Sequence, residues 1–345
     1  MRIATFPDGK VIDHYTVDDE ALHTPGPEEN WQESVAMWCR DEEANLDVFM
    51  RLGHEPRMDG GNVTQWAFLQ TPDCVFAHNE QFPLRAGDIG EASINAGGMG
   101  SYRYDGKGTT WGLKSDEVSW EFSLTPIHQP IPLYPAHNPD YVRAVGGAHF
   151  EVSDLMEGTV TIKGKTRRLR GLAYRDHSWG PRNWYNLKTH RWTAGVLSEE
   201  RTFAFSNFCT DNTGISRRGY IREGSIIHYT LDVDILAYME SDAFCHRGGA
   251  ITATLDDGTV HRIEMSPHFA GQKGNVSPKR GNLMFDGPAA VRWNGMTGGA
   301  ILEVAENHRR GREPLTVLTR GYFGNGILEY EGQALARQIA EYTPA

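Results

Sequence analysis

The sequence predicts a two-domain, all-β protein, and three observations support this prediction. Apolar and polar side chains alternate repeatedly along the chain, and a sustained helical stripe is almost nowhere found. The 38 glycines and 17 prolines are dispersed, as expected for many short strands joined by tight turns. A chain of 345 residues exceeds what one hydrophobic core usually organises, so two domains are expected.

Individual strands can be placed from this alternation. Residues 118–124 put four apolar side chains on one face of a pleated strand and three polar side chains on the other, and residues 229–235 follow the same pattern. The turn pair Asp257-Gly258 between two alternating runs predicts a β-hairpin. Residues 34–39 and 46–50 could be helical or extended, and we favour two strands around an acidic turn.

Two further features concern the domain boundary and the tail. Residues 125–140 are rich in proline and polar side chains, which suits neither strand pairing nor a helix. We therefore expect a first β-barrel domain over residues 1–135 and a second over 136–345, with a small-molecule pocket at their junction. Residues 332–341 are rich in helix formers and predict a short C-terminal helix.

Composition excludes several classes of function. The formal net charge of −11 disfavours nucleic acid and anionic lipid as partners. No apolar run resembles a signal peptide or a membrane span, so a cytoplasmic protein without membrane insertion is expected. The cysteines show no metal-ligand spacing and are expected to be reduced and structural: Cys39, Cys74, Cys209 and Cys245.

The segment 171–192 has the densest collection of reactive and aromatic side chains in the chain. If residues 172–179 form a strand, Asp176 and Ser178 lie on one face, while His177 and Trp179 share the other. A histidine beside an indole, with a carboxylate adjacent in sequence, suits proton transfer near neutral pH. We therefore expect Asp176 and His177 to be catalytic.

The residues that follow supply further candidates. Arg182, after a Gly-Pro turn, could orient Asp176 or hold a substrate oxygen, and we include it among the catalytic residues. Trp179, Trp184 and Tyr185 are expected to shape an apolar substrate wall, with His190 fixing an oxygen substituent or the attacking water.

The run Asp176-His177-Ser178-Trp179-Gly180 resembles the Asp-His-x-Trp-Gly signature of the carotenoid 1,2-hydratase (hydroxyneurosporene synthase) and AttH-like family. The resemblance implies two lipocalin-like antiparallel β-barrel domains around an apolar cavity. It also implies acid-catalysed addition of water to a double bond without a cofactor. The chain departs from the family pattern where a Tyr-x-Asp is expected, because residues 203–206 read Phe-Ala-Phe-Ser.

That departure leaves the proton donor open. Asp176 is the first candidate, followed by Asp211 and by His78 and Glu80, which we place at the substrate site from the first domain.

Together these observations predict a cofactor-independent lyase of the hydratase or dehydratase type, acting on a hydrophobic terpenoid, steroid or aromatic molecule. A carbon–carbon lyase that releases formaldehyde from an aromatic substrate would need the same general base. A carrier that binds a hydrophobic ligand without altering it is the alternative from another class. In a further alternative, Asp176, His177 and Arg182 form a buried polar knot that only stabilises the strand.

Other chemistries are disfavoured. Residues 97–100 lack the strand, helix and lysine of a phosphate-binding loop, and the histidines lack metal-ligand spacing, so neither a nucleotide nor a metal is expected. Ser178 lacks the strained turn of a nucleophilic serine. Substrate identity and oligomeric state stay open, a homodimer included.

Overall fold

The computed structural model divides the chain into two compact units, which are described separately. One unit comprises Val11–Arg182, and the other comprises Asn183–Ala345 together with Met1–Lys10. The structure describes residues 6–7, 9–10, 12, 14–134, 147–210, 214–240, 245–279, 282–307, 321–323 and 326–328.

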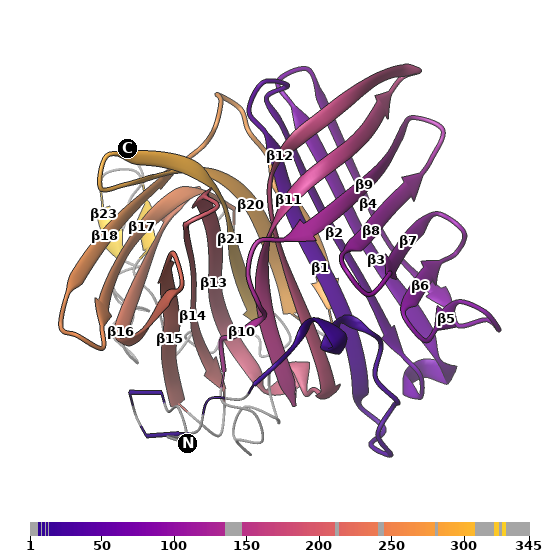
Figure 1. Ribbon diagram of the computed structural model, residues 1–345, viewed down its shortest axis with the longest axis horizontal. Helices are drawn as coiled ribbons and strands as arrows, with labels where there is room; N and C mark the ends of the chain where they lie inside the picture. The colour runs from indigo at the N-terminus through magenta and orange to yellow at the C-terminus, as the bar shows by residue number, and fades with distance from the viewer. Residues whose placement is uncertain are drawn as a thin grey trace. The chain divides into compact units, whose positions relative to one another are not determined.

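The first unit is a twelve-stranded antiparallel sheet that curves into an open half-barrel (Figure 1). Its strands follow the order β4-β3-β2-β1-β12-β11-β9-β8-β7-β6-β5, and β10 pairs with β11. The elements are η1 (Val17–Glu20), β1 (Trp31–Asp41), β2 (Leu46–Glu55), η2 (Met58–Gly60), β3 (Asn62–Thr71), β4 (Cys74–Pro83), β5 (Ile89–Gly90), β6 (Ser93–Ala96), β7 (Gly100–Tyr104), β8 (Thr109–Lys114), β9 (Val118–Pro126), β10 (Ile131–Pro132), β11 (Ala148–Ile162) and β12 (Lys165–Pro181).

The second unit contains a closed barrel of eight strands. The ring runs β15-β14-β13-β21-β20-β18-β17-β16 and closes because β15 also pairs with β16. The elements are η3 (Trp184–Asn186), β13 (Leu187–Ser198), β14 (Arg201–Thr210), β15 (Gly214–Glu223), β16 (Ile226–Met239), β17 (His246–Leu255), β18 (Val260–Ser266), β19 (Asn275–Lys279), β20 (Asn282–Trp293), β21 (Met296–Asn307), β22 (Gly321–Phe323) and β23 (Gly326–Leu328).

The predicted fold class is confirmed, and so are the strands placed from alternation. Residues 118–124 lie in β9, whose buried and exposed positions alternate, and the hairpin turn at Asp257-Gly258 joins β17 to β18. Gly258 has a φ of +84°, which explains why glycine suits this turn. Residues 34–39 and 46–50 form β1 and β2, as favoured. The expected C-terminal helix at 332–341 lies outside the described residues.

The division between the units differs from the boundary expected between residues 135 and 136. The long hairpin of β11 and β12 pairs with β9 on one side and with β1 on the other, so it completes the first sheet. The Asp176–Gly180 motif therefore belongs to the first unit and not to the second. Proline-rich residues before the hairpin form β10, a short strand added to β11.

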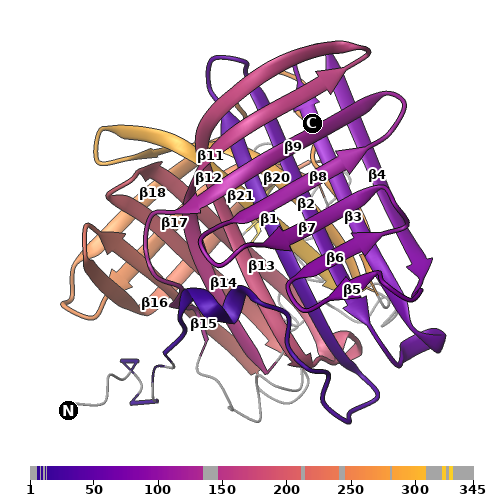
Figure 2. The same cartoon turned by 45° about the vertical axis from the view of Figure 1, so that its right-hand side comes forward.

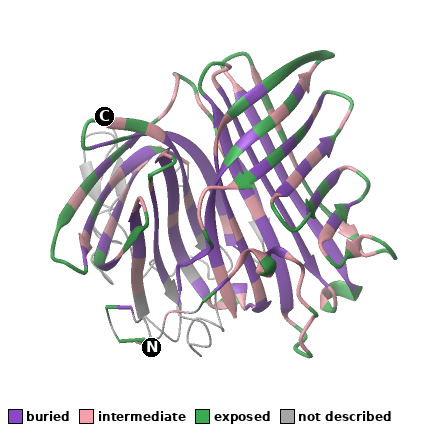
Figure 3. Ribbon diagram, viewed as in Figure 1, coloured by how far each residue is buried: buried purple, intermediate pink, exposed green. Residues whose placement is uncertain are grey.

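Each unit has its own apolar core. In the half-barrel the core lies on one face of the sheet, here called the inner face, and it includes Val35, Met37 and Ala173. The opposite, outer face carries the alternate residues of the same strands, such as Ser34 and Ala36. Figures 2 and 3 show the broad central strands β1 to β3, which are buried almost throughout, whereas the edge strand β4 is largely exposed.

Candidate functional site

Strand β12 carries one candidate centre on each face. Its pairing sets His177 opposite Val35 of β1, so that His177 lies on the inner face with the core. Asp176, one residue earlier, lies opposite Ala36 on the outer face. The alternation of side chains along β12 that the sequence predicted is thus present. It places Asp176 and His177, which were expected to move the proton together, on opposite faces of the sheet.

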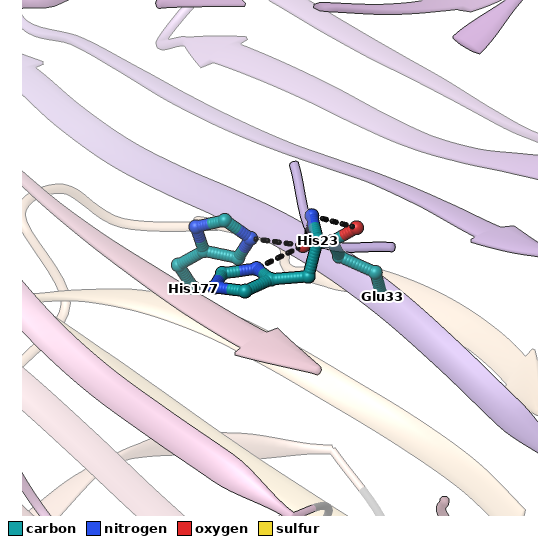
Figure 4. A group of neighbouring side chains, drawn as sticks. All are labelled: His23, Glu33 and His177. Carbon is teal, nitrogen blue, oxygen red and sulfur yellow. Dashed lines mark hydrogen bonds and ion pairs between the residues drawn. The ribbon is translucent and has the colours of Figure 1, made fainter. Parts of the chain in front are cut away.

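On the inner face, His177 finds its carboxylate partner in Glu33 of β1 (Figure 4). The His177 Nε2 lies 3.0 Å from Glu33 Oε1, and the His23 Nδ1 lies 2.7 Å from the same oxygen. The backbone N–H of His23 also donates to this carboxylate, at 3.0 Å. His177 and Glu33 are completely buried. Glu33 therefore joins β12 to β1 and to the segment that follows η1.

The hydrogen bonds fix the charge of Glu33. Burial alone would raise the pKa of this carboxyl, but hydrogen bonds and charge from His177, with further hydrogen bonds from His23, lower it to about 2. Glu33 is thus an ionised carboxylate at any physiological pH. The His177 Nδ1 is buried and has no hydrogen-bond partner in the part of the chain that the structure describes.

Aromatic rings cover this inner centre. The His23 ring stacks on Trp179 with centroids 3.7 Å apart, and the rings of Phe150 and His177 meet edge to face at 5.5 Å. Tyr15 packs against Trp179 from the N-terminal side of η1, at 5.5 Å. Trp179 therefore lies beside the imidazole of His177, and the two side chains share one environment, as the sequence predicted.

A buried ion pair anchors the same covering segment. Glu20, the last residue of η1, pairs with Arg175, and the Arg175 Nε also donates to Asp154 Oδ2 at 2.8 Å. All three side chains are almost fully buried. Such a network holds the segment before β1 firmly against the inner face, because breaking it would leave a buried charge unpaired.

His23, Glu33 and His177 also have donor atoms within 4.8 Å of one another, close enough to surround a metal ion. However, both oxygens of the Glu33 carboxylate accept the backbone N–H of His23, at 3.0 and 3.2 Å. A cation at the same oxygens would be repelled by that N–H dipole, so the geometry suits a hydrogen-bonded cluster.

The outer face carries a chain of carboxylate, imidazole and hydroxyl groups. Glu151 Oε1 lies 2.9 Å from His149 Nε2, and His149 Nδ1 lies 2.7 Å from Ser178 Oγ. A carboxylate on Nε2 favours the tautomer in which Nδ1 accepts the Ser178 hydroxyl. The Tyr134 ring lies against the imidazole, with centroids 5.1 Å apart.

Asp176 lies beside this chain, directly across from Glu151. Burial, with a smaller contribution from the Glu151 charge, raises the pKa of Asp176 to about 6 against the opposing effects of His149, Arg182 and Arg51. The carboxyl makes no hydrogen bond within the described residues. Asp176 is partly exposed, and so is Ala36 opposite it, whereas the rest of β1 is buried. Solvent therefore reaches a carboxyl that titrates near neutral pH.

The remaining predicted residues lie in several places. Arg182 ends the first unit, is buried, and acts on Asp176 through its charge. His78 and Glu80 pair with each other at 3.3 Å on β4, four strands from β12, which is about 19 Å along the sheet. Their place at the substrate site stays a prediction.

The other three predicted residues belong to the second unit. Trp184 is buried in η3, and Tyr185 beside it is 43% exposed. His190 of β13 lies 2.8 Å from Glu303 Oε1 and 3.0 Å from Ser206 Oγ. Asp211, the secondary proton-donor candidate, lies outside the described residues.

Sequence reasoning missed four side chains: His23, Glu33, His149 and Glu151. Glu33 lies just before the apolar run of residues 35–39 in the same strand, and a charged residue there was a signal that it must have a buried partner. His149 and Glu151 at alternate positions of one strand were also visible as a pair on one face. Which strands would bring them to β12 was not visible.

Fold and site together define an all-β protein whose half-barrel holds imidazole–carboxylate pairs on both faces of its sheet. The chain belongs to the family described as a domain of unknown function, DUF7064, whose model matches residues 16–308. No curated protein matches it. Within the described residues, none of the helices is both long and apolar enough to cross a membrane.

Solved structures share the fold at low sequence identity. A protein from Nitrosomonas europaea, provisionally assigned as an AttH, is 14% identical with a TM-score of 0.62, covering 86% of this chain and 99% of its own. CghA, solved with Sch210972, is 9% identical with a TM-score of 0.59, at 88% and 96% coverage. Kievitone hydratase from Nectria haematococca is 10% identical with a TM-score of 0.51, at 88% and 95% coverage.

Proposed function

We propose that this protein is a cofactor-independent lyase that adds or removes water on a hydrophobic terpenoid, steroid or aromatic molecule. Asp176 is the general acid, and His149 receives the second proton through Ser178. The observation that carries the proposal is the Asp176 carboxyl, which is partly exposed, free of hydrogen bonds within the described residues, and adjacent to the His149–Glu151 pair.

The exposure of the candidate acids to solvent decides which face of β12 we assign to the reaction. A general acid must reach the substrate and must have a pKa near the working pH. Asp176 meets both requirements, whereas Glu33 is ionised, fully buried and saturated with N–H donors. We therefore assign the inner cluster of His177, Glu33 and His23 to holding β12 and the preceding segment in place.

The chemistry balances without a co-reactant. In the dehydration direction, protonated Asp176 gives its proton to the substrate hydroxyl, the C–O bond breaks and water leaves. The neighbouring carbon loses a proton to Ser178 Oγ while the Ser178 proton moves to His149 Nδ1, 2.7 Å away. Glu151 stabilises the resulting imidazolium, which returns the proton to Asp176 through solvent. Hydration is the reverse sequence.

Three observations outside the site support the proposal. Kievitone hydratase shares the fold, and its name states a hydration reaction. The motif around His177 resembles that of the carotenoid hydratases. The net charge of −11 disfavours polyanionic partners and leaves a small molecule as the natural ligand in a cytoplasmic setting.

A pooled incubation tests the activity. Purified protein is mixed, without added cofactor, with terpenoid, steroid and lignin-derived aromatic compounds, and mass spectrometry follows each compound. Gain or loss of water that disappears in His149→Gln supports the lyase. Loss of formaldehyde indicates the carbon–carbon variant, and retention of an unchanged compound indicates a carrier. His228→Gln is the matched control, because His228 forms an exposed pair with Asp256 at 3.1 Å.

The pH dependence of the reaction gives a second test. Because Asp176 must be protonated and its pKa is raised to about 6, kcat/KM is expected to fall tenfold per pH unit above about 6. The Asp176→Glu variant should keep the fall in kcat/KM at alkaline pH, but the midpoint of this fall should lie at a different pH. A profile without an alkaline limb would contradict the role of Asp176.

A further inference from the structure

The two edges of the half-barrel sheet differ in how far they are protected against pairing with another strand. At one edge lies β5, of two residues, and at the other lies β4, of ten. Within the described residues β4 pairs only with β3, so its second side has no neighbouring strand. Natural sheets protect such edges with short strands, bulges, proline or lysine. A long edge without these features is a surface to which a further strand can add.

Strand β4 lacks these protective features along almost its whole length. Its pairing with β3 is continuous from Cys74 to Pro83 without a bulge, and its one proline is the last residue. The strand contains neither lysine nor arginine, and Val75, Ala77 and Gln81 are exposed. The edge is therefore long, regular and accessible to solvent.

The side chains on the inner face of β4 read almost symmetrically along the strand: Phe76, His78, Glu80 and Phe82. Their partners on β3 include Val63 and Leu69 of the inner core. In a two-fold antiparallel pairing of two copies, His78 of one copy can lie opposite Glu80 of the other. The same register sets Phe76 opposite Phe82, and the symmetry makes each contact twice.

Charge favours this register over its neighbours. Shifting one copy by two residues would set Glu80 opposite Glu80 in one direction and His78 opposite His78 in the other. A charge on the inner face of an edge strand usually discourages pairing, but here the two-fold register supplies each Glu80 with an imidazole. Within one chain the His78 Nε2 lies 3.3 Å from Glu80 Oε2, and the two side chains are 29% and 50% exposed, so both can reach a second copy.

We propose that the protein forms a two-fold dimer through β4, in which two half-barrel sheets join edge to edge into one continuous sheet. The partner is a second copy of this chain, held by main-chain hydrogen bonds between the two strands and by the paired contacts of His78 with Glu80. Because one pair of strand edges buries less than the roughly 1,200 Å² of a standard interface, the dimer dissociates on dilution. The proposal is independent of the lyase activity.

Sedimentation velocity of the full chain across a wide range of concentration tests this proposal. The wild-type protein is expected to reach twice the mass of one chain at high concentration. His78→Glu places a second carboxylate opposite Glu80, and Glu80→Lys places a cation opposite His78, so each variant alone should associate about 10- to 100-fold more weakly. An equimolar mixture of the two variants should recover the dimer, since each introduced charge then faces its opposite on the other variant.

Recovery in the mixture identifies a contact between chains, because the pair within each single strand stays altered in both variants. Glu157→Lys is the control, since Glu157 pairs with Arg170 at 3.3 Å on the surface of the same sheet, and this variant should dimerise as the wild type does. A wild-type protein that stays monomeric at every concentration would overturn the proposal. So would a dimer that survives both substitutions, or a mixture of the two variants that stays monomeric.

Discussion

Replacing Asp176 with asparagine is expected to lower kcat/KM of the lyase reaction by about 100- to 10,000-fold, the usual contribution of a positioned general acid. The amide keeps the size of the side chain but cannot donate an acidic proton to a leaving hydroxyl. Steady-state turnover of the compound found in the pooled incubation measures the effect. Asp116→Asn, in an exposed turn, is the control and should react at the wild-type rate.

The same substitution should raise the stability of the protein at neutral pH. The pKa of Asp176 rises from 3.8 to about 6 on folding, so ionisation costs folding free energy that is absent below pH 3.8 and complete above pH 6. The amide of the Asp176→Asn variant never ionises, and its free energy of unfolding at pH 7.5 should therefore increase by about 2 kcal/mol, allowing for the partial hydration of the carboxylate. Urea unfolding at pH 4 and 7.5 compares the two proteins. Loss of stability at pH 7.5 would identify Asp176 as a structural residue.

These opposite effects on turnover and stability explain why the site contains an unfavourable group. A carboxyl whose ionised form is costly is the kind of residue that proteins retain for chemistry and lose when selected for stability. His149 and Glu151 differ from it, because their mutual hydrogen bond stabilises the charged forms. The outer face thus places a carboxyl with a raised pKa beside an imidazole that is hydrogen-bonded to a carboxylate.

Local features of the fold were predictable because they depend on neighbours in sequence. Alternation along residues 118–124 and the turn at Asp257-Gly258 each determine one strand or hairpin, and both are present. The division into units was not predictable from composition, since it depends on β12 pairing with β1, more than a hundred residues earlier. Proline content marked a break in regular structure, but a break is not a domain boundary.

The candidate site, like the fold, was predictable only in its local features. The pleat of β12 predicted that His177 and Trp179 share a face and that Asp176 and Ser178 share the other, and the structure agrees. The partners on each face come from other strands, whose register the sequence does not specify. Adjacent residues in a strand point in opposite directions, so the sequence proximity of Asp176 and His177 was no guide to a shared proton.

Replacing His177 with alanine is expected to destabilise the protein by about 3 to 5 kcal/mol, because it removes a donor from a fully buried carboxylate. The lowered pKa of Glu33 corresponds to a free energy of unfolding of similar size. Its fall from 4.5 to about 2 on folding contributes about 3 kcal/mol of stability, which is present above pH 4.5 and is lost as pH falls through 2. Glu33→Gln should therefore remove this part of the acid sensitivity, and urea unfolding between pH 2 and 7 measures it.

The turnover of the His177→Ala variant shows whether His177 has a structural or a catalytic role. If His177 and Glu33 only hold β12 in place, kcat/KM normalised to the folded fraction should stay within about tenfold of wild type, since the outer face keeps Asp176 and His149. The alkaline limb near pH 6 should also persist, because Asp176 sets it. A His177→Ala protein that is as stable as wild type and inactive would instead move the reaction to the inner face, with the His177 Nδ1 as the atom that meets the substrate.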